Sequence, residues 1–226
     1  MRRGRGRALT STPERTEVLR RGVGIGIAVG AYGLSFGAAA TTAGLSVAQA
    51  CALSLLVFTG ASQFALVGVL GAGGSAVAGV ATALLLGSRN TMYSLSLAER
   101  IPLSPARKLL AAQITIDEST AVSASAPRSL AGLGFWTAGL SVYVCWNLAT
   151  LLGALGASAL DTHALGLDAA VGAAFLGLLW PRLREAPRVA AGGALVAAVA
   201  VPLMPAGAPV LLAGLVVLPL LLKARR

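Results

Sequence analysis

The chain has 226 residues, of which 56% are hydrophobic and only 12% are charged. A soluble chain carries about twice that share of charge, so this composition indicates an integral membrane protein. The formal net charge of +10 could suggest nucleic-acid binding. However, the basic residues gather in the tails and in short loops between apolar segments, which is the pattern of the positive-inside rule and argues against that function.

Residues 1–21 form a polar, arginine-rich tail, and the first apolar segment follows at 22–40. A basic start, an apolar run and small residues at 38–40 resemble a cleaved signal peptide. The apolar run is too long for one, so we expect a retained first span. The tail is predicted to be cytoplasmic.

Short polar or Gly/Pro breaks divide the rest of the chain into about eight apolar segments. These are 22–40, 47–70, 75–97, 109–125, 133–153, 165–180, 189–203 and 208–222. The prediction is an all-α, polytopic helical membrane protein with about seven to eight transmembrane segments in a single domain over 22–226. Segments 109–125 and 189–203 are shorter than a full crossing, so we expect some segments to be tilted, broken or re-entrant.

Orientation follows from the loop charges. With the tail inside and every segment crossing, Arg128, the 181–188 loop and the C-terminus lie inside and the loop carrying Asp161 lies outside. Three basic residues contradict this arrangement, because they would lie outside: Arg100, Arg107 and Lys108. Either a preceding segment is re-entrant or this loop is an exception to the rule.

Glycines recur at helical spacing in two segments. The first has Gly26 with Gly30 and Gly33 with Gly37, and the other has Gly79, Ala83 and Gly87. Stripes of small residues let membrane helices approach closely and gain dispersion contacts. We therefore predict helix packing along them rather than simple flexibility.

A first polar cluster interrupts segment 47–70, where Gly60 lies among Thr59, Ser62 and Gln63. A glycine beside hydroxyl and amide groups favours a helix break whose freed N–H groups could meet an anionic substrate group. The alternative is that these side chains only form hydrogen bonds between helices, which average ~0.6 kcal/mol each.

A second cluster contains Arg89, Asn90 and Tyr93 near the end of an apolar segment. The long arginine stem could snorkel to the interface, or the guanidinium could pair with Asp117 or Glu118. The spacing of Asn90 and Tyr93 favours an inward polar face.

The third cluster is the adjacent acids Asp117 and Glu118, in a stretch that otherwise reads as membrane. A carboxylate in bilayer hydrocarbon costs roughly 2.5–3.5 kcal/mol on insertion scales, so such residues face protein or water and serve a pathway by default. On a continuous helix Gln113, Asp117 and Thr120 would share one face, with Glu118 about 100° away. One acid could balance Arg89, and the other could bind a substrate ammonium or carry a proton. The alternative is a helix end at the interface with both acids in water.

No enzyme or metal site is expected. Gly33–Gly37 matches G-x-S-x-G around Ser35, but it lies in a helical run rather than at a strand-to-helix turn. The only histidine, His163, is far in sequence from Cys51 and Cys145, which read as small apolar residues. We therefore predict no cofactor and no metal.

Four stretches, in this order, resemble the AzlC family of bacterial branched-chain amino acid transport proteins. They are 33–38, 55–64, 86–97 and 115–119, and the most specific is Phe-Thr-Gly-Ala-Ser-Gln-Phe at 58–64. The resemblance covers residues 22–125 well and implies the large subunit of an amino acid exporter with a small AzlD-type membrane partner. One departure is Asn90, which stands where we associate a histidine with the family.

These features together predict a secondary exporter of valine, leucine, isoleucine or methionine in the bacterial inner (cell) membrane. The acids suggest proton coupling. Residues for substrate binding or coupling are Gly60, Ser62, Gln63, Arg89, Asn90, Tyr93, Asp117 and Glu118. The alternative is a non-transporting assembly subunit whose polar clusters bind a partner helix.

Overall fold

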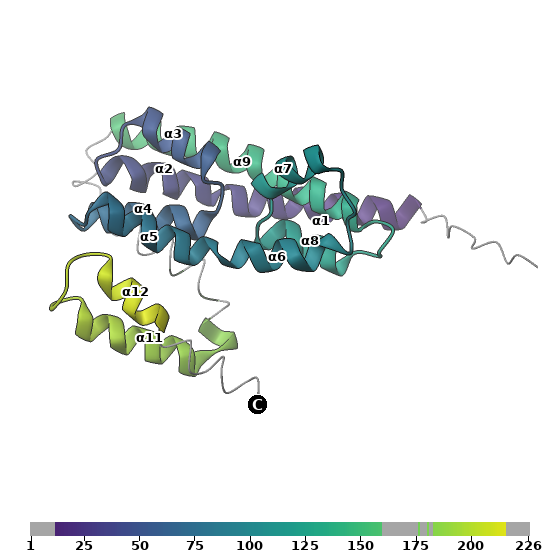
Figure 1. Cartoon of the computed structure of the whole chain (residues 1–226). Coiled ribbons are helices and arrows are strands. Elements are labelled where there is room, and N and C mark those ends of the chain that lie inside the picture. The colour runs from purple at the N-terminus through teal and green to yellow at the C-terminus, as the bar shows by residue number, and fades with distance from the viewer. Residues whose placement is uncertain (1–11, 160–175, 177–179, 181–182, 216–226) are drawn as a thin grey trace, which may run out of the picture. The chain divides into compact units, whose positions relative to one another are not determined.

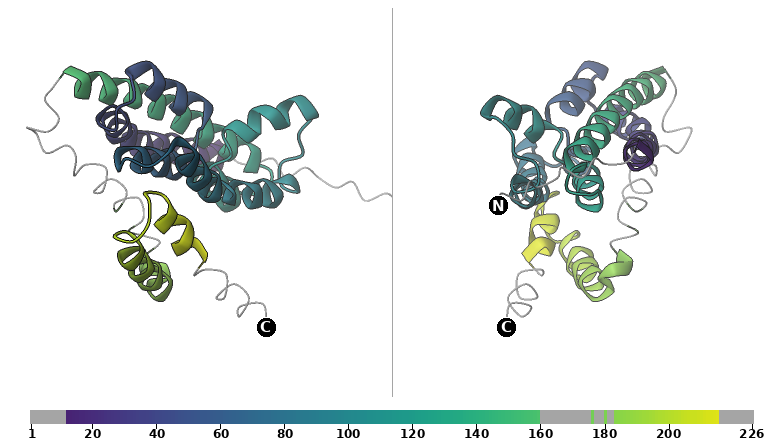
Figure 2. Two further views of the ribbon diagram at one scale, coloured as in Figure 1. Left: turned by 60° about the vertical axis from the view of Figure 1, so that its left-hand side comes forward. Right: turned by 90° about the vertical axis from the view of Figure 1, so that its right-hand side faces the viewer.

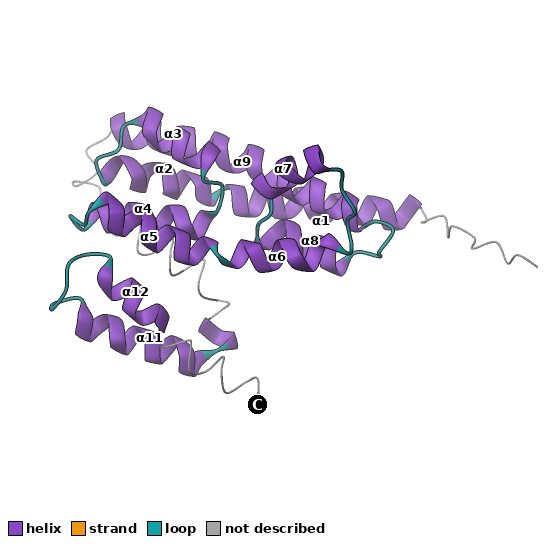
Figure 3. Ribbon diagram, viewed as in Figure 1, coloured by secondary structure: helices purple, strands orange, loops and turns teal. Residues whose placement is uncertain are grey.

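The computed structural model describes residues 12–159, 176, 180 and 183–215. Within these residues every regular element is a helix and there is no strand, as the all-α prediction requires (Figure 3). The helices are α1 (Thr12–Gly30), α2 (Tyr32–Thr42), α3 (Val47–Leu56), α4 (Gly60–Gly71), α5 (Ala76–Gly87), α6 (Arg89–Ala98), α7 (Pro105–Gln113), α8 (Asp117–Ser125), α9 (Ala131–Ala159), α11 (Pro187–Ala200) and α12 (Ala208–Leu215) (Figure 1).

The chain forms two compact units, each described here by itself. The first unit contains residues 1–30 and 90–145, and the second contains 31–89 and 146–226. The continuous helix α9 therefore contributes its N-terminal part to the first unit and its C-terminal part to the second. That residues 22–226 act as one transmembrane domain stays a prediction.

In the first unit α1 runs parallel to the start of α9. A Cβ on Gly22 would lie 2.8 Å from the Thr137 side chain, and one on Gly26 would collide with Ser141. Residue numbers increase in the same direction along both helices at this contact, so the two helices run parallel. The glycines thus let the two helices approach closely, as predicted for Gly26; Gly22 was not part of the predicted stripe.

In the second unit α2 runs parallel to the end of α9 through the same kind of contact. A Cβ on Gly33 would collide with the Trp146 carbonyl, and one on Gly37 with the Thr150 carbonyl. Gly153 of α9 also packs closely against α2, because a Cβ at this position would collide with the carbonyl of Leu34. The prediction of packing rather than flexibility is confirmed for these positions.

Helices α3, α4 and α5 complete this unit with α11 and α12. Both α3 and α4 pack on α2, and α4 packs along α5. Residue pairs along the last contact run in opposite directions, since Gly79 faces Leu66 and Gly87 faces Ser62. Helices α11 and α12 lie side by side and are joined by the loop at 201–207 (Figure 2).

Two continuous helical stretches are long and apolar enough to cross a membrane, Thr12–Thr42 and Ala131–Ala159. The other apolar helices are shorter, among them α3, α4 and α11. The predicted segments at 47–70, 75–97 and 109–125 each appear as two short helices rather than one. Most of the predicted segment at 165–180 lies outside the described residues.

Candidate functional site

The predicted helix break at the first polar cluster is present. Helix α3 ends at Leu56 and α4 begins at Gly60. The extended Thr59 precedes α4, but its side chain makes no capping hydrogen bond. The first N–H groups of a helix have no intrahelical acceptor and carry the positive end of its dipole. The start of α4 therefore presents N–H groups that no side chain caps.

Gln63 fixes the geometry of this break. Its side-chain amide donates to the Val57 carbonyl at 2.6 Å, and its Oε1 accepts from the Trp146 indole N–H at 3.1 Å. The amide nitrogen also lies 3.3 Å from the carbonyl oxygen of Ser54 at the end of α3. Gln63 is fully buried. It therefore joins the end of α3, the start of α4 and α9; its role toward substrate stays a prediction.

Three aromatic rings form a cluster, and one of them, Trp146, lies against Gly60; the sequence did not predict this cluster. Trp146 stacks on Phe36 with 6.1 Å between ring centroids, and Phe64 meets both rings edge-on. A Cβ on Gly60 would lie only 3.0 Å from the Trp146 ring. Glycine thus allows the Trp146 ring to approach the backbone closely here. The available signal was a tryptophan in an apolar helix, whose N–H needs a buried acceptor.

Ser62 and Thr59 add buried hydroxyl groups to this break. The Ser62 side chain is 1% exposed, and its Oγ faces Gly87 of α5. Among the described residues neither hydroxyl oxygen has a hydrogen-bond partner. Buried polar groups normally have a partner, so these two hydroxyls are the unsatisfied polar groups of the cluster.

A second break separates α7 from α8 in the first unit. Ser119 supports it, because its Oγ donates to the Ile114 carbonyl at 2.7 Å and accepts from the Ile116 N–H at 3.1 Å. Asp117 and Glu118 are the first two residues of α8, and both are partly buried. Carboxylates are favourable at a helix N-terminus because of the dipole.

This break corrects one sequence-based prediction. Gln113 ends α7 and Asp117 begins α8, so they do not lie one turn apart on a single helix. The predicted common face of Gln113, Asp117 and Thr120 is therefore wrong, although the expectation that segment 109–125 could be broken is confirmed. The Thr120 hydroxyl is buried and has no hydrogen-bond partner among the described residues.

The second polar cluster lies at the start of α6. Arg89, Asn90 and Tyr93 are all partly buried. The division between units falls between Arg89 and Asn90, and both acids belong to the unit of Asn90. Pairing of Arg89 with Asp117 or Glu118 stays a prediction, as does snorkelling.

Two further arginines hold the loops of the first unit, and sequence analysis assigned them only a topological role. The Arg100 guanidinium donates to the carbonyl oxygens of Ser123, Ala124 and Ala126 at 3.0–3.3 Å, at the end of α8. Arg128 donates to the Glu99 carbonyl at 3.1 Å. Arginine suits this work because its planar group carries five donors.

The described residues contain no group of three or more His, Cys, Asp or Glu side chains placed to hold a metal. His163 lies outside these residues. Ser35 lies within α2, so the strand-to-helix turn that a hydrolase nucleophile requires is not formed around it.

Comparison with known proteins agrees with the resemblance noted above. A family model described as "AzlC protein" matches residues 24–160, beyond the 22–125 stretch that carries the motifs. No curated protein and no solved structure matches the chain. The family match, together with the apolar helices, makes this a membrane protein. The chain belongs to the AzlC family, which is associated with branched-chain amino acid transport.

Proposed function

We propose that the chain is a membrane transporter that exports valine, leucine, isoleucine, methionine or similar small apolar amino acids. The observation that carries this proposal is that two apolar segments of an AzlC-family chain break at their polar clusters, at 57–59 and at 114–116. Broken helices at membrane depth are tolerated where they line a cavity, and in many transporters they form the substrate site.

An amino acid zwitterion needs one anion-binding and one cation-binding group. The uncapped N–H groups at Gly60–Ser62, with the buried Ser62 hydroxyl, suit the carboxylate, and Arg89 is a second candidate. Asp117 or Glu118 suits the ammonium group, and the other acid could carry the coupled proton. We assign Gln63 to holding the break at Gly60 in place, and Asn90 and Tyr93 to the polar lining of α6.

The proposal includes location and partner. We place the chain in the bacterial inner membrane with the N-terminus in the cytoplasm and about seven to eight membrane segments. A small AzlD-type membrane subunit is the expected partner. The basis for this partner is the resemblance of the four sequence stretches to the AzlC family.

The test measures intracellular valine, leucine, isoleucine and methionine in cells that lack the gene. We expect these four to accumulate, and the wild-type gene to relieve the accumulation. Asp117→Asn and Glu118→Gln should fail to relieve it at equal protein level, whereas Glu99→Gln, an acid in a loop outside the site, should succeed. Unchanged levels of all four amino acids in the deletion strain would contradict the proposal.

The second candidate function is a non-transporting assembly subunit. It is favoured by Gln63, whose side-chain hydrogen bonds are satisfied within the chain and so serve structure. It predicts that Ser62→Ala and Asn90→Ala lose co-purification with the small partner. Transport predicts instead that the complex survives and that efflux is lost.

A further inference from the structure

None of the four helices in the two broken segments is long enough to cross a bilayer by itself. Helices α7 and α8 have 9 residues each, and α3 and α4 have 10 and 12. At the α-helical rise these helices are about 14–18 Å long, against ~30 Å of bilayer hydrocarbon. The question is therefore whether each pair continues in one direction or turns back.

In the first unit the pair α7–α8 turns back. The end of α8 lies beside the loop that precedes α7, because Arg100 binds the Ser123 and Ala126 carbonyls. Ala126 also packs with Val18 of α1 and with Leu130, just before α9. The two ends of the hairpin, the start of α1 and the start of α9 therefore share one end of this unit.

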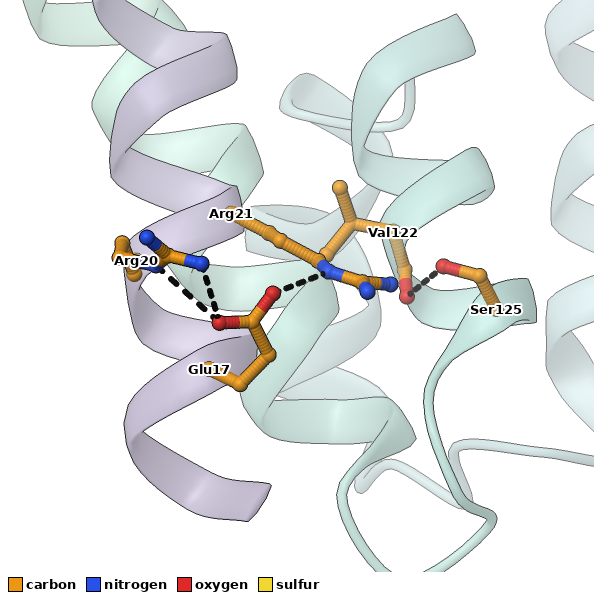
Figure 4. A network of polar contacts seen from close by, with 5 residues as sticks. All are labelled: Glu17, Arg20, Arg21, Val122 and Ser125. Atoms are coloured by element: carbon orange, nitrogen blue, oxygen red, sulfur yellow. Dashed lines mark hydrogen bonds and ion pairs between the residues drawn. The ribbon is translucent and has the colours of Figure 1, made fainter. Parts of the chain in front are cut away.

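That shared end is basic. It carries the following Lys and Arg residues of α1, the loops and α7: Arg15, Arg20, Arg21, Arg100, Arg107, Lys108 and Arg128. Its acidic residues are fewer, namely Glu14, Glu17 and Glu99. Glu17 binds Arg20 and Arg21 at 2.8 Å each, and the Arg21 side chain extends toward Val122 and Ser125 of α8 (Figure 4).

In the second unit the pair α3–α4 also turns back. Gln63 of α4 reaches the carbonyls at the end of α3, and Gly71 at the end of α4 faces Ala43, just after α2. The loops 43–46 and 72–75 that flank the hairpin contain no charged residue. The loop 201–207, whose Ala206 carbonyl lies beside Gly74, contains none either.

The order of the chain relates these loops to the membrane surfaces. The helical stretch Thr12–Thr42 is continuous, and it is long and apolar enough to cross a membrane. Arg15, Arg20 and Arg21 lie near its start, and the uncharged loop 43–46 follows its last residue. If this stretch crosses, the basic residues and loop 43–46 belong to opposite membrane surfaces.

We propose that α7–α8 enters the bilayer from the cytoplasmic surface and returns to it, and that α3–α4 enters from the opposite surface and returns there. Neither segment crosses. Arg100, Arg107 and Lys108 then lie inside, and the conflict with the positive-inside rule disappears. Asp117 and Glu118 lie at the tip of the cytoplasmic hairpin, within the bilayer rather than at its surface.

The test is cysteine accessibility to a membrane-impermeant maleimide in the full chain, with Cys51 and Cys145 replaced by alanine. Single cysteines are placed at both ends of each hairpin: Arg107→Cys with Ser125→Cys, and Ser46→Cys with Ala72→Cys. Arg15→Cys and Met204→Cys mark the two surfaces. Labelling is compared between right-side-out and inside-out vesicles.

We expect the Arg107→Cys and Ser125→Cys variants to react only in inside-out vesicles, like Arg15→Cys. The Ser46→Cys and Ala72→Cys variants should react only in right-side-out vesicles, like Met204→Cys. Members of one pair on opposite surfaces would overturn the proposal, and so would a cysteine that reacts only after detergent is added. These readouts do not depend on what is transported, so a failure of the transport proposal leaves them unaffected.

Discussion

The hydrogen bond between Gln63 and Trp146 is predicted to stabilise the α3–α4 hairpin by a measurable amount. Gln63→Leu keeps the side-chain volume but removes both the donor and the acceptor. Trp146 is only 3% exposed, so its indole N–H would then be buried without a hydrogen-bond partner. This loss should lower the free energy of unfolding by about 1–3 kcal/mol. The Val57 carbonyl would lose its 2.6 Å hydrogen bond from Gln63 but keep the one from the Thr59 N–H at 2.8 Å. The loss of the first bond therefore adds only about 1 kcal/mol. The expected total is about 2–4 kcal/mol.

A double-mutant cycle isolates this bond. Trp146→Phe alone leaves Gln63 Oε1 unpartnered, whereas the double variant removes both partners. The double variant should therefore cost about 1–3 kcal/mol less than the sum of the single variants. The measurement is reversible unfolding of the purified protein in detergent, with Trp136→Phe as a control in the first unit. Single-variant costs that add to the cost of the double variant within about 0.5 kcal/mol would show that Gln63 and Trp146 do not stabilise each other.

Three other predictions concern stability. Gly37→Ala should lower the unfolding free energy by about 1–3 kcal/mol, because the added Cβ would collide with the Thr150 carbonyl. Gly24→Ala is the control and should cause no such loss, because nothing lies within 4 Å of the added Cβ. Equal losses of stability in thermal unfolding would contradict this prediction. Arg100→Met should cost about 1–3 kcal/mol and expose the end of α8 to faster hydrogen exchange, because three carbonyls lose their donor; Arg107→Met is the control. Ser119→Ala should cost about 1–2 kcal/mol through lost support of α8, and unchanged stability of this variant would count against the break as described.

The helix break at Gly60 could be predicted from sequence because its cause is local. A glycine lies next to side chains that compete for backbone hydrogen bonds. The direction of the chain after the break could not be predicted, because it depends on Gln63 and Trp146, which are 83 residues apart. Only the folded chain brings those two side chains together.

The break before Asp117 illustrates the opposite difficulty. The spacing of Gln113, Asp117 and Thr120 fits a continuous helix, yet the helix ends at Gln113. The local signal was weak: the β-branched run Ile114-Thr115-Ile116 only modestly disfavours helix. The Ser119 hydroxyl, which satisfies the backbone groups freed there, looks in the sequence like any other serine.

The most direct test of the account is valine efflux from proteoliposomes that contain the purified chain, with its small partner where one co-purifies, and an internal pH indicator. We expect valine efflux with a matching proton movement, and loss of that movement in Asp117→Asn or Glu118→Gln but not in Glu99→Gln. Efflux and proton movement that are indifferent to both site variants would contradict the role given to these two acids.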